Sequence, residues 1–497
     1  MKKKIAIIGS GISGLSAASY CAQSGNEVHV FEKQSQPGGR ARQFQTTNGY
    51  TFDMGPSWYW MPDIIESFFN DFGYRTSDFY DLIALNPQFE MIFKDEKVSV
   101  PKSYEALKAL FEDIEKGAGK RLDVFMKAAK FKYDVGMREF VNKPCHSWLE
   151  FMSPKIAGTA LKLNLLTNFR SYVGRYFSNP KLRTLMEFPV IFLGASPIKI
   201  PALYSLMNYG GYALGTWYPA GGFYQLVIAM KKVAEEQGAH FHFNQNIDQI
   251  VVEQGQAKGL IVNGTFHAFD GIIASCDYHH TETLLEPEMR NYDEKYWASR
   301  TFAPSCLIYY LGFKERIPGL KHHTLFFEND LDEHVDTIYN TKKWPEKPLF
   351  YACCPSKTDP TVAPEGCENL FLLIPLATGL SDAESVREKY LDEMLERIEK
   401  HTGTKNLKSK LDYKKSYCVS DFINDYNAYG GNAYGLANTL NQTAVLKPSV
   451  KNKHISNLFY TGQLTVPGPG VPPSIISGNI VAKEVDKLKI SRYEKAI

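Results

Sequence analysis

The stretch "KIAIIGSGISGLSAASYCAQSGNEVHVFE", residues 4–32, decides the fold of this chain. Its opening "KIAIIG" is a short apolar run, which is typical of a buried parallel strand. The small residues of "SGLSAASYCAQSG" predict a helix that ends at Gly25. The alternating apolar positions of "NEVHVFE" predict a second strand. Together these segments predict a βαβ unit that begins at residue 4.

Three glycines lie between the predicted strand and helix at the spacing GxGxxG, and they are Gly9, Gly11 and Gly14. With 37 glycines in the chain the spacing alone is weak, but its position between strand and helix makes it specific. The first permits a tight turn, the second lets a pyrophosphate approach the backbone, and the third lets helix and strand pack closely. Glu32 ends the second strand, where a carboxylate accepts hydrogen bonds from a ribose and repels the 2′-phosphate of NADP. The unit therefore predicts dinucleotide binding.

The residues that follow distinguish FAD from NAD. The segment "EKQSQPGGRARQF" contains a diglycine and an arginine, which are Gly38, Gly39 and Arg40. This spacing is that of flavoprotein oxidases and desaturases, in which the diglycine lets the chain pass beside the FAD diphosphate. The segment "FDMGPSWYW", residues 52–60, resembles the part that these proteins place near the isoalloxazine ring, and it contributes Asp53, Gly55 and Pro56. No second βαβ fingerprint for a nicotinamide domain occurs in the sequence, so the pattern favours FAD.

Four segments together resemble one family: the N-terminal unit, "PAGGFYQLVIAM" (219–230), "YHHTET" (278–283) and "TGQLTVPGPGVPPSIISG" (461–478). The chain resembles the bacterial-type phytoene desaturases, FAD-dependent carotenoid desaturases of the amine-oxidase-like flavoprotein superfamily, essentially from end to end. The resemblance implies an α/β fold, with a Rossmann-like FAD-binding domain interleaved with an α+β substrate domain and a largely helical, membrane-associating region. It also implies stepwise dehydrogenation of phytoene towards lycopene at a membrane surface.

The last of these segments concentrates prolines and glycines where the predicted strand "NLFYTG" ends. Ligands of open α/β sheets lie outside the carboxyl ends of the strands, so we expect residues 461–478 to form a wall of the flavin site. Gly462 is expected near the phosphate and ribityl chain, and "GVPPSII" beside the isoalloxazine. The complete set of residues expected at FAD is Gly9, Ser10, Gly11, Ser13, Gly14, Glu32, Lys33, Gly38, Gly39, Arg40, Gly55, Pro56, Ser57, Ile250, Gly462, Gly470, Val471, Pro472, Pro473 and Ile475.

The chain shows no linker, so we expect interleaved domains. Residues 1–75, 215–290 and 450–497 are expected to form the FAD-binding domain, and residues 291–449 a substrate-binding α+β region. Residues 76–214 are expected to form a helical, apolar region for substrate and membrane. Its part 148–214 is too broken by proline and polar residues to span a bilayer. The basic residues available there for anionic lipid headgroups are Lys155, Lys162, Arg170, Arg175, Lys181 and Arg183.

The composition is that of an ordinary folded protein, with 44% hydrophobic and 22% charged residues. The net charge of +2 gives no argument for nucleic acid as a partner. Eight cysteines without a CxxC pair indicate reduced thiols in a cytoplasmic protein. No apolar run predicts a transmembrane helix. The family resemblance implies peripheral association with the membrane, which we expect at the inner face of the cell membrane.

Desaturation needs a hydride acceptor, which flavin supplies, and a proton acceptor. We consider Asp134 and Glu150 for the proton, because these acidic residues lie in or beside the aromatic-rich helical middle of the chain. Two histidine pairs also stand out, residues 279–280 and residues 322–323. Neither has a metal-ligand partner nearby in the sequence, so we expect no metal site.

Several alternatives stay open. A hydroxycarotenoid 3,4-desaturase or a diapophytoene desaturase would differ only in tunnel length and end groups, and a carotenoid isomerase would use FAD without net oxidation. An amine oxidase would share the glycine motifs, but the apolar stretch 148–214 argues against its polar entrance. A non-enzymatic lipid-binding flavoprotein is the remaining class. The electron acceptor, oxygen or a quinone, and the oligomeric state also stay open.

Overall fold

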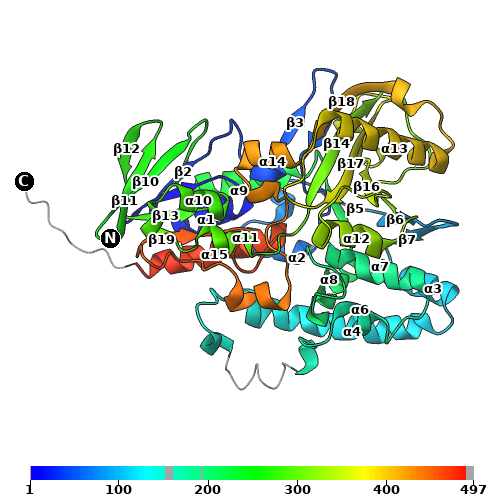
Figure 1. The fold of residues 1–497 in the computed structure, drawn as a ribbon, viewed down its shortest axis with the longest axis horizontal. Helices are drawn as coiled ribbons and strands as arrows, with labels where there is room; N and C mark the ends of the chain where they lie inside the picture. The colour runs from blue at the N-terminus through cyan, green and yellow to red at the C-terminus, as the bar shows by residue number, and fades with distance from the viewer. Residues whose placement is uncertain (1, 152–160, 192–193, 489–497) are drawn as a thin grey trace, which may run out of the picture.

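The computed structural model describes residues 2–151, 161–191 and 194–488 of the chain. Two main sheets organise the molecule, a five-stranded sheet around the predicted βαβ unit and a seven-stranded sheet built from the middle of the chain (Figure 1). The chain leaves the first sheet, builds the second and returns, so its last helix packs beside its first (Figure 1). This is a mixed α/β architecture of interleaved segments.

The five-stranded sheet is parallel, with strand order β19-β13-β1-β2-β9. Its strands are β1 (Lys4–Ile8), β2 (Glu27–Phe31), β9 (Ala239–His242), β13 (Gly271–Ala274) and β19 (Leu458–Tyr460). Because both faces are covered, the inner strands β1 and β13 are almost wholly buried and apolar. Residues 1–75, 215–290 and 450–497 supply all five strands. The connections reverse direction between β1 and β13, which opens a crevice at their carboxyl ends.

Helices cover one face of this sheet and a small antiparallel sheet covers the other (Figure 1). The helices are α1 (Ile12–Gln23), α9 (Tyr224–Glu236) and α15 (Val471–Asp486), and the covering strands are β10 (Ile247–Glu253), β11 (Gln256–Val262) and β12 (Thr265–Ala268). Glycines allow the close packing: a Cβ at Gly14 would lie 2.2 Å from the Gly9 carbonyl oxygen, and a Cβ at Gly478 would lie 2.5 Å from the Ser13 carbonyl oxygen. The third glycine of the motif is therefore a packing requirement.

The seven-stranded sheet has strand order β18-β14-β17-β16-β15-β6-β7. Its strands are β6 (Phe89–Ile92), β7 (Lys97–Val100), β14 (Ser305–Phe313), β15 (His323–Phe326), β16 (Phe350–Cys353), β17 (Glu368–Leu376) and β18 (Leu411–Tyr417). Strands β6 and β7 lie within residues 76–214, which we expected to be helical, and this part of the expectation is wrong. Four-residue strands give little periodicity, and only the alternating burial of "KVSV" in β7 carries the strand signal.

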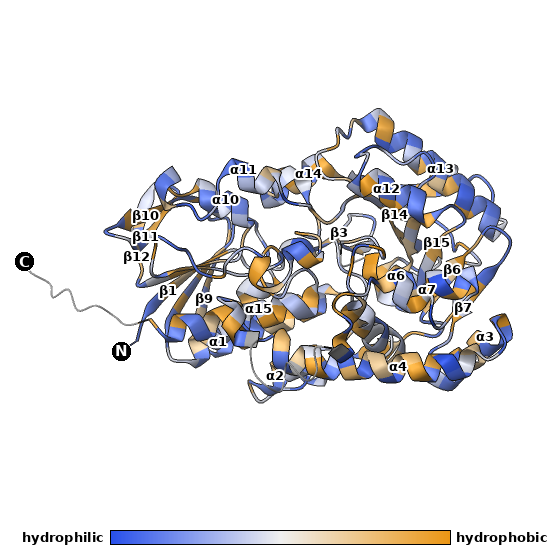
Figure 2. Ribbon diagram, turned by 60° about the horizontal axis from the view of Figure 1, so that its bottom comes forward, coloured by the Kyte–Doolittle hydropathy of each residue, from blue (hydrophilic) through white to orange (hydrophobic). Residues whose placement is uncertain are grey.

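Helices of the central region pack on one face of the seven-stranded sheet and α13 (Glu384–Thr402) packs on the other. The central helices are α3 (Tyr104–Ile114), α4 (Ala118–Val135), α6 (Phe169–Val173), α7 (Pro180–Ile191) and α8 (Leu206–Asn208). Figure 2 shows α4 and α13 with hydrophobic and hydrophilic residues side by side, as helices with one buried side require.

The remaining elements are short and connect the two parts. They are α2 (Pro62–Asn70), α10 (Tyr278–Thr283), α11 (Glu294–Ala298), α12 (Leu331–Tyr339), α14 (Val419–Tyr426) and the strand pairs β3 (Gln43–Gln45) with β4 (Thr51–Asp53) and β5 (Leu82–Ala84) with β8 (Trp217–Pro219). Among the described residues, none of the helices is both long and apolar enough to cross a membrane.

Candidate active site

A cavity opens at the carboxyl ends of β1, β2 and β13, where the crevice of the parallel sheet is expected. The predicted residues that line it are Gly9, Gly11, Glu32, Lys33, Gly39 and Arg40. Residues that the motif did not indicate complete the lining, namely Gln245, Ile247, Cys276, Asp277, His280, Asp425, Tyr426 and Asn427 among others. The eight named residues come from three separate parts of the chain, so no local pattern indicates them.

A second cavity of about 1000 Å³ adjoins the first and shares Gly11, Gly39 and Arg40 with it. Its predicted lining residues are Gly11, Ser13, Gly38, Gly39, Arg40, Gly55, Pro56, Gly462, Gly470 and Val471. Both ends of the chain and the segment after β4 therefore meet around one space. The pair of cavities has the extended form that a dinucleotide needs, with one end at the second strand and the other facing the seven-stranded sheet.

The shared residues fit a pyrophosphate. The Arg40 Nη2 donates to the Asn432 carbonyl at 3.0 Å, whereas its buried Nε finds no hydrogen-bond partner among the described residues, and desolvation lowers the pKa of this side chain. A guanidinium with a buried N–H left over is a suitable partner for an anion. A Cβ built on Gly11 meets no atom within 4 Å in the described part of the chain, so the cradle has room above the backbone. The residues present therefore fit FAD, whose diphosphate would lie between Gly11, Gly39 and Arg40.

Glu32 is held rigidly at the nucleotide end of the first cavity. Its Oε2 accepts hydrogen bonds from the Ser10 backbone N–H at 2.9 Å and the Ser10 hydroxyl at 2.8 Å. Its Oε1 accepts one from the Gln34 backbone N–H at 2.9 Å. Ser10 thus orients the carboxylate from behind, and the remaining lone pairs of Glu32 are available to ribose hydroxyls.

The loop after β19 forms the wall of the second cavity. The Ser477 hydroxyl fixes the loop start, since it accepts from the Thr461 hydroxyl and from the Gly462 N–H, both at 3.0 Å. Pro469, Gly470, Val471 and Ser474 then line the cavity where α15 begins. Pro472 and Pro473 lie in the first turn of α15, where proline costs no hydrogen bond. Ile475 packs in the core, and its carbonyl accepts from the Ser16 hydroxyl at 2.7 Å.

One residue expected to contact FAD, Ile250, does not line the cavity, whereas another residue of the same strand does. Ile250 lies in the hydrophobic core between β10 and the parallel sheet, and its N–H bonds the Leu284 carbonyl at 3.1 Å. Ile247 of the same strand lines the cavity instead. The expectation for Ile250 is therefore corrected to Ile247, because only the first residue of β10 reaches the crevice.

The far side of the second cavity is an apolar floor on the seven-stranded sheet. Cys306 and Ile308 of β14 and Leu373 of β17 line it. Cross-strand register continues this row away from the cavity: Ile308 pairs with Leu373, Leu373 with Tyr351, and Tyr351 with Leu325. Nothing in the sequence marked these residues, because the register that aligns them joins strands that are separated along the chain.

A third, apolar cavity of about 460 Å³ continues the floor between α7, α12 and the sheet, and Leu373 lines both it and the second cavity. Its lining includes Phe188, Ile191, Leu325, Val335, Ile338 and Phe350. His334 also lines it, but both ring nitrogens are engaged, one with the Leu349 N–H at 2.9 Å and the other with the Pro375 carbonyl at 2.8 Å. The cavity therefore suits a hydrocarbon.

Neither predicted proton acceptor faces these cavities. Asp134 forms an ion pair with Lys130, one turn back on α4, at 2.7 Å, and its side chain is 41% exposed. Glu150 caps a loop, since it accepts from the backbone N–H groups of Cys145, His146 and Ser147. The catalytic expectation for Asp134 and Glu150 is therefore wrong, because both carboxylates are engaged at the molecular surface.

The two histidine pairs occupy different places. His280 lines the first cavity, where burial lowers its pKa to about 4, and His279 faces outward with Glu294 at 2.8 Å. His322 and His323 are buried in the seven-stranded sheet beside Cys353. Cys353, which is distant from residues 322–323 in the sequence, is thus a potential metal-ligand partner in space.

The sequence pattern of the family described as flavin containing amine oxidoreductase matches residues 12–486. A carotenoid 3,4-desaturase of Haloarcula japonica is 38% identical over 482 residues, with 96% of this chain and 97% of the relative covered. A zeta-carotene-forming phytoene desaturase of Myxococcus xanthus is 29% identical, covering 97% and 94%. A 4,4'-diapophytoene desaturase of Staphylococcus haemolyticus is also 29% identical, covering 96% and 98%.

Solved structures share the fold at low sequence identity. An oxidoreductase from Methanosarcina mazei superposes with a TM-score of 0.63 at 17% identity, covering 97% of this chain and all of the other. Putrescine oxidase bound to putrescine superposes with a TM-score of 0.61 at 13% identity, covering 98% and 99%. The family match, the relatives and the cavity that fits FAD agree. The chain belongs to the flavin-containing amine oxidoreductase family and, within it, to the FAD-dependent carotenoid desaturases.

Proposed function

We propose that this enzyme desaturates an acyclic carotenoid hydrocarbon, with phytoene as substrate and lycopene as end product. The observation that carries the proposal is the apolar floor, which runs from the cavity that fits FAD through Leu373 into the third cavity. A rod-shaped hydrocarbon needs a long dry surface, and the row Ile308, Leu373, Tyr351 and Leu325 lines the second and third cavities in succession. A small cationic amine would instead need polar groups at that place.

The chain's own residues mainly position the substrate and exclude water from the site. When bound, FAD supplies the hydride acceptor for each new double bond. Ile308 and Leu373 hold the polyene against the open side of the second cavity, and residues 54–56 and 462–471 close the other sides. Placement in a dry site accounts for much of such catalysis. The proton passes to a weak base, because conjugation in the polyene stabilises the positive charge that develops as the hydride leaves.

A 3,4-desaturase acting near the end of a hydroxylated carotenoid is the second candidate. The Haloarcula japonica relative bears that name and is more similar to this chain than the phytoene desaturase relative, at 38% against 29% identity. The two candidates differ in how much polyene lies beyond the reacting bond, so the third cavity decides between them. Occupation of the third cavity requires a long apolar arm of the substrate beyond the reacting bond.

The test is an incubation of the FAD-loaded enzyme with vesicles that contain either phytoene or a hydroxylated acyclic carotenoid. We expect phytoene to give coloured intermediates and then lycopene. Reaction with the hydroxylated carotenoid alone would establish the second candidate, and an isomer of unchanged mass would establish an isomerase. A C30 substrate serves as a further arm, because a diapophytoene desaturase would prefer it. No reaction with any carotenoid would overturn the proposal.

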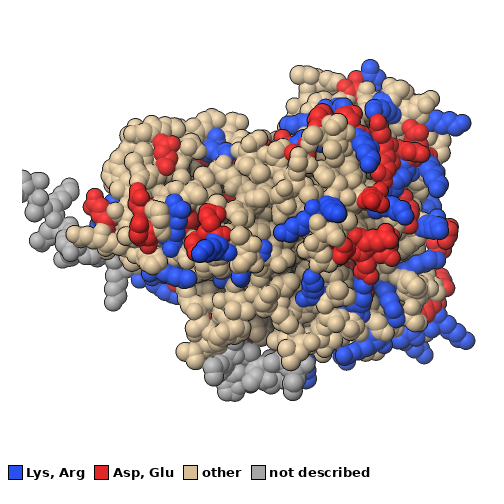
Figure 3. Space-filling view, viewed as in Figure 1, with Lys and Arg blue, Asp and Glu red and all other residues tan. Residues whose placement is uncertain are grey.

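We further propose that the enzyme takes its substrate from a membrane through the lower edge of Figure 1. Large hydrophobic residues there are 43% to 94% exposed, and they are Trp148, Leu149, Leu166, Leu440 and Leu446. The described segments that carry them, residues 148–151, 161–166 and 440–446, lie at the same edge (Figure 1). Figure 3 shows that this part of the face carries few charged side chains. Exposed apolar patches of this kind mark interaction surfaces.

The basic residues expected to meet lipid headgroups contribute less to this edge. Arg170 pairs with Glu187 and Asp332, Lys181 with Glu96, and the Arg183 guanidinium donates to the Phe177 carbonyl. Lys155 lies outside the described residues. The proposal predicts that Leu149→Glu with Leu166→Glu reduces flotation with vesicles while FAD absorbance stays unchanged. Unchanged flotation would contradict it, and Ile423→Glu, at another exposed hydrophobic residue, is the control.

A further inference from the structure

A second cluster of reactive side chains lies in the seven-stranded sheet, outside the cavities that fit FAD. His322, His323 and Cys353 are 5%, 0% and 2% exposed, and their potential ligand atoms all lie within 4.8 Å of one another. The antiparallel register brings them together, since His323 opens β15 and pairs with Cys353 at the end of β16. The cluster is therefore fixed by the sheet and not by a flexible loop.

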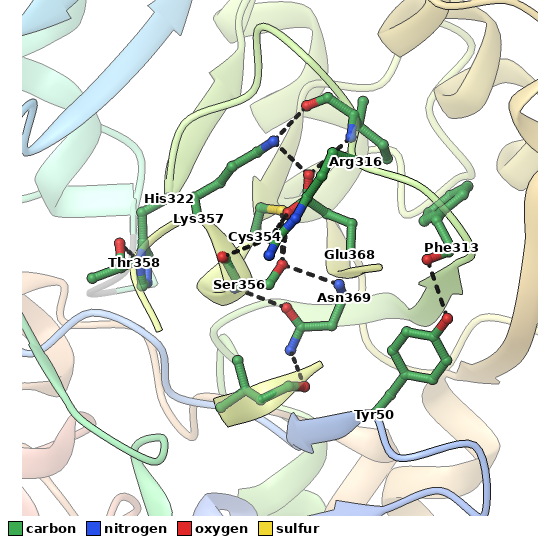
Figure 4. A network of polar contacts seen from close by, with 12 residues as sticks. Tyr50, Phe313, Arg316, His322, Cys354, Ser356, Lys357, Thr358, Glu368 and Asn369 are labelled. Atoms are coloured by element: carbon green, nitrogen blue, oxygen red, sulfur yellow. Dashed lines mark hydrogen bonds and ion pairs between the residues drawn. The ribbon is translucent and has the colours of Figure 1, made fainter. Parts of the chain in front are cut away.

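Each histidine of this cluster has one ring nitrogen engaged and the other free. His322 Nδ1 bonds the Thr358 hydroxyl at 2.8 Å (Figure 4), and His323 Nδ1 bonds the Tyr351 hydroxyl at 2.6 Å. Both Nε2 atoms are buried and find no hydrogen-bond partner among the described residues. Trp58 stacks on His323 with ring centroids 4.2 Å apart and planes 10° apart, which fixes the ring. Metal-binding histidines have this arrangement, with the second nitrogen oriented by another group.

The electrostatic surroundings of the cluster are negative. The Asp53 side chain lines one small cavity together with His322 and Cys353. The Asp359 carboxylate accepts from the Tyr218 hydroxyl at 3.2 Å, and the Tyr218 ring lies 4.7 Å from the His322 ring. Two carboxylates near three potential ligands form an environment that a cation would stabilise.

Neighbouring cations do not provide that compensation. Figure 4 shows Arg316 and Lys357 directed at Glu368, which is fully buried and bound by both. Space for an ion and a bound water adjoins the cluster, since Asp53, Ser57, His322 and Cys353 line one small cavity. The site thus combines free ligand atoms, negative surroundings and room.

We propose that His322, His323 and Cys353 form a structural zinc site. The ligands are the two Nε2 atoms and the Cys353 thiolate, and a water in the adjoining cavity takes the fourth position. Nitrogen and sulfur donors suit Zn²⁺, and the nearby carboxylates favour a divalent ion over a monovalent one. With Zn–N of about 2.0–2.1 Å and Zn–S of about 2.3 Å, donors lie roughly 3.3–3.7 Å apart, so side-chain shifts of about 1 Å close the site.

Zinc binding would join the start of β15 to the end of β16. Zn²⁺ displaces the proton of the Cys353 thiol to solvent, and no electron is transferred. The ion would hold Tyr351, whose hydroxyl also bonds the Ser57 hydroxyl at 2.9 Å. Ser57 follows Gly55 and Pro56 of the flavin wall, so the ion would steady the contact between the floor and that wall.

The test uses the full-length, FAD-loaded protein, stripped with a chelator and then titrated with Zn²⁺, or with Co²⁺ as a spectroscopic probe. We expect one zinc ion per chain by elemental analysis, and Co²⁺ d–d bands at wavelengths longer than the flavin absorbs. Cys353→Ser and His322→Asn should each weaken binding by at least about tenfold. Retained flavin absorbance shows that each variant is folded.

Cys354→Ser is the matched control, because this adjacent cysteine is equally buried but lies in the core on the opposite face of the sheet. It should bind zinc like the parent. The proposal is overturned if the parent binds no stoichiometric zinc. It is also overturned if Cys353→Ser binds like the parent, or if Cys354→Ser loses binding as fully as Cys353→Ser.

Discussion

The nucleotide end and the substrate end of the active-site cavity are built in opposite ways. At the nucleotide end, backbone groups around Gly9 and Gly11 and the oriented carboxylate of Glu32 provide directed polar contacts. At the substrate end, side chains such as Ile308 and Leu373 provide an apolar surface without directed contacts. A charged cofactor needs hydrogen bonds at fixed positions, whereas a hydrocarbon needs only shape and the exclusion of water. Mutations at the first end should therefore act through cofactor retention, and mutations at the second through turnover.

The largest expected effect separates two glycines of the same motif. Gly14→Val should prevent folding, because its Cβ would lie 2.2 Å from the Gly9 carbonyl oxygen. Gly11→Val should fold, because its Cβ meets no described atom within 4 Å, but should lose FAD affinity by at least about 100-fold, or roughly 2.7 kcal/mol. Circular dichroism and flavin absorbance of the two purified variants measure the difference. A yellow Gly11→Val protein would show that the diphosphate does not lie there.

Replacement of the ribose acceptor should have the next largest effect. Glu32→Arg places a cation beside the Ser10 N–H and removes the acceptor, so the purified variant should retain no FAD. Glu32→Gln keeps one acceptor oxygen and should retain FAD more weakly than the parent. Equal flavin content in Glu32→Arg and the parent would contradict the assignment of Glu32 as the acceptor for the FAD ribose.

A charge in the apolar floor should affect turnover and leave the cofactor in place. Leu373→Asp introduces a carboxylate into the surface that joins the second and third cavities. We expect desaturation to fall at least about tenfold, because burying a charge beside a hydrocarbon is costly, while FAD content stays equal. Leu373→Met, which conserves volume, should stay near the parent rate. Loss of FAD in Leu373→Asp would contradict the division into two ends.

Acid should lower the free energy of unfolding through His334, which lines the third cavity. Burial lowers the pKa of this side chain to about 4. Its folded pKa is below the unfolded value of about 6.5, so the unfolded state binds the proton first. The free energy of unfolding should therefore fall between about pH 6.5 and pH 4, by up to about 3 kcal/mol from this group. His334→Gln keeps both hydrogen-bond roles and should flatten this slope in denaturant titrations at several pH values. An unchanged slope would show that His334 is not the group responsible.

The smallest expected effect is at the carboxylates that the sequence suggested for catalysis. Asp134→Asn should leave the desaturation rate within about twofold, since its exposed ion pair with Lys130 contributes little. Glu150→Gln removes a charge that caps three backbone N–H groups and should cost roughly 1 kcal/mol of stability without a matching loss of rate. A rate loss of several orders of magnitude in either variant would restore it as a proton acceptor.

The nucleotide end could be predicted from sequence because its parts are local. The turn at Gly9, the helix after it and Glu32 all lie within one βαβ unit, and the wall at Gly462 follows a strand that ends in the same crevice. The glycines are informative because each position permits something that a side chain would block. The family resemblance added the same parts and the identity of the cofactor, which the family match supports.

The substrate end could not be predicted, because register between distant strands assembles it. Leu373 faces Ile308 and Tyr351 only through the pairing of β14, β17 and β16. The pairing of β15 with β16 likewise brings Cys353 to His323, which no sequence spacing suggests. Asp134 was misjudged because composition does not show which side of a helix faces solvent. Strands β6 and β7 were missed because each is only four residues long.

The most direct test of the account is an anaerobic single-turnover experiment with the FAD-loaded enzyme and phytoene in vesicles. If both ends of the cavity serve one reaction, the visible absorbance of oxidised flavin should disappear as one new carbon–carbon double bond forms per flavin. Leu373→Asp should keep its FAD and show little bleaching. Bleaching by putrescine with none by phytoene or any other carotenoid would contradict the account and indicate amine oxidation.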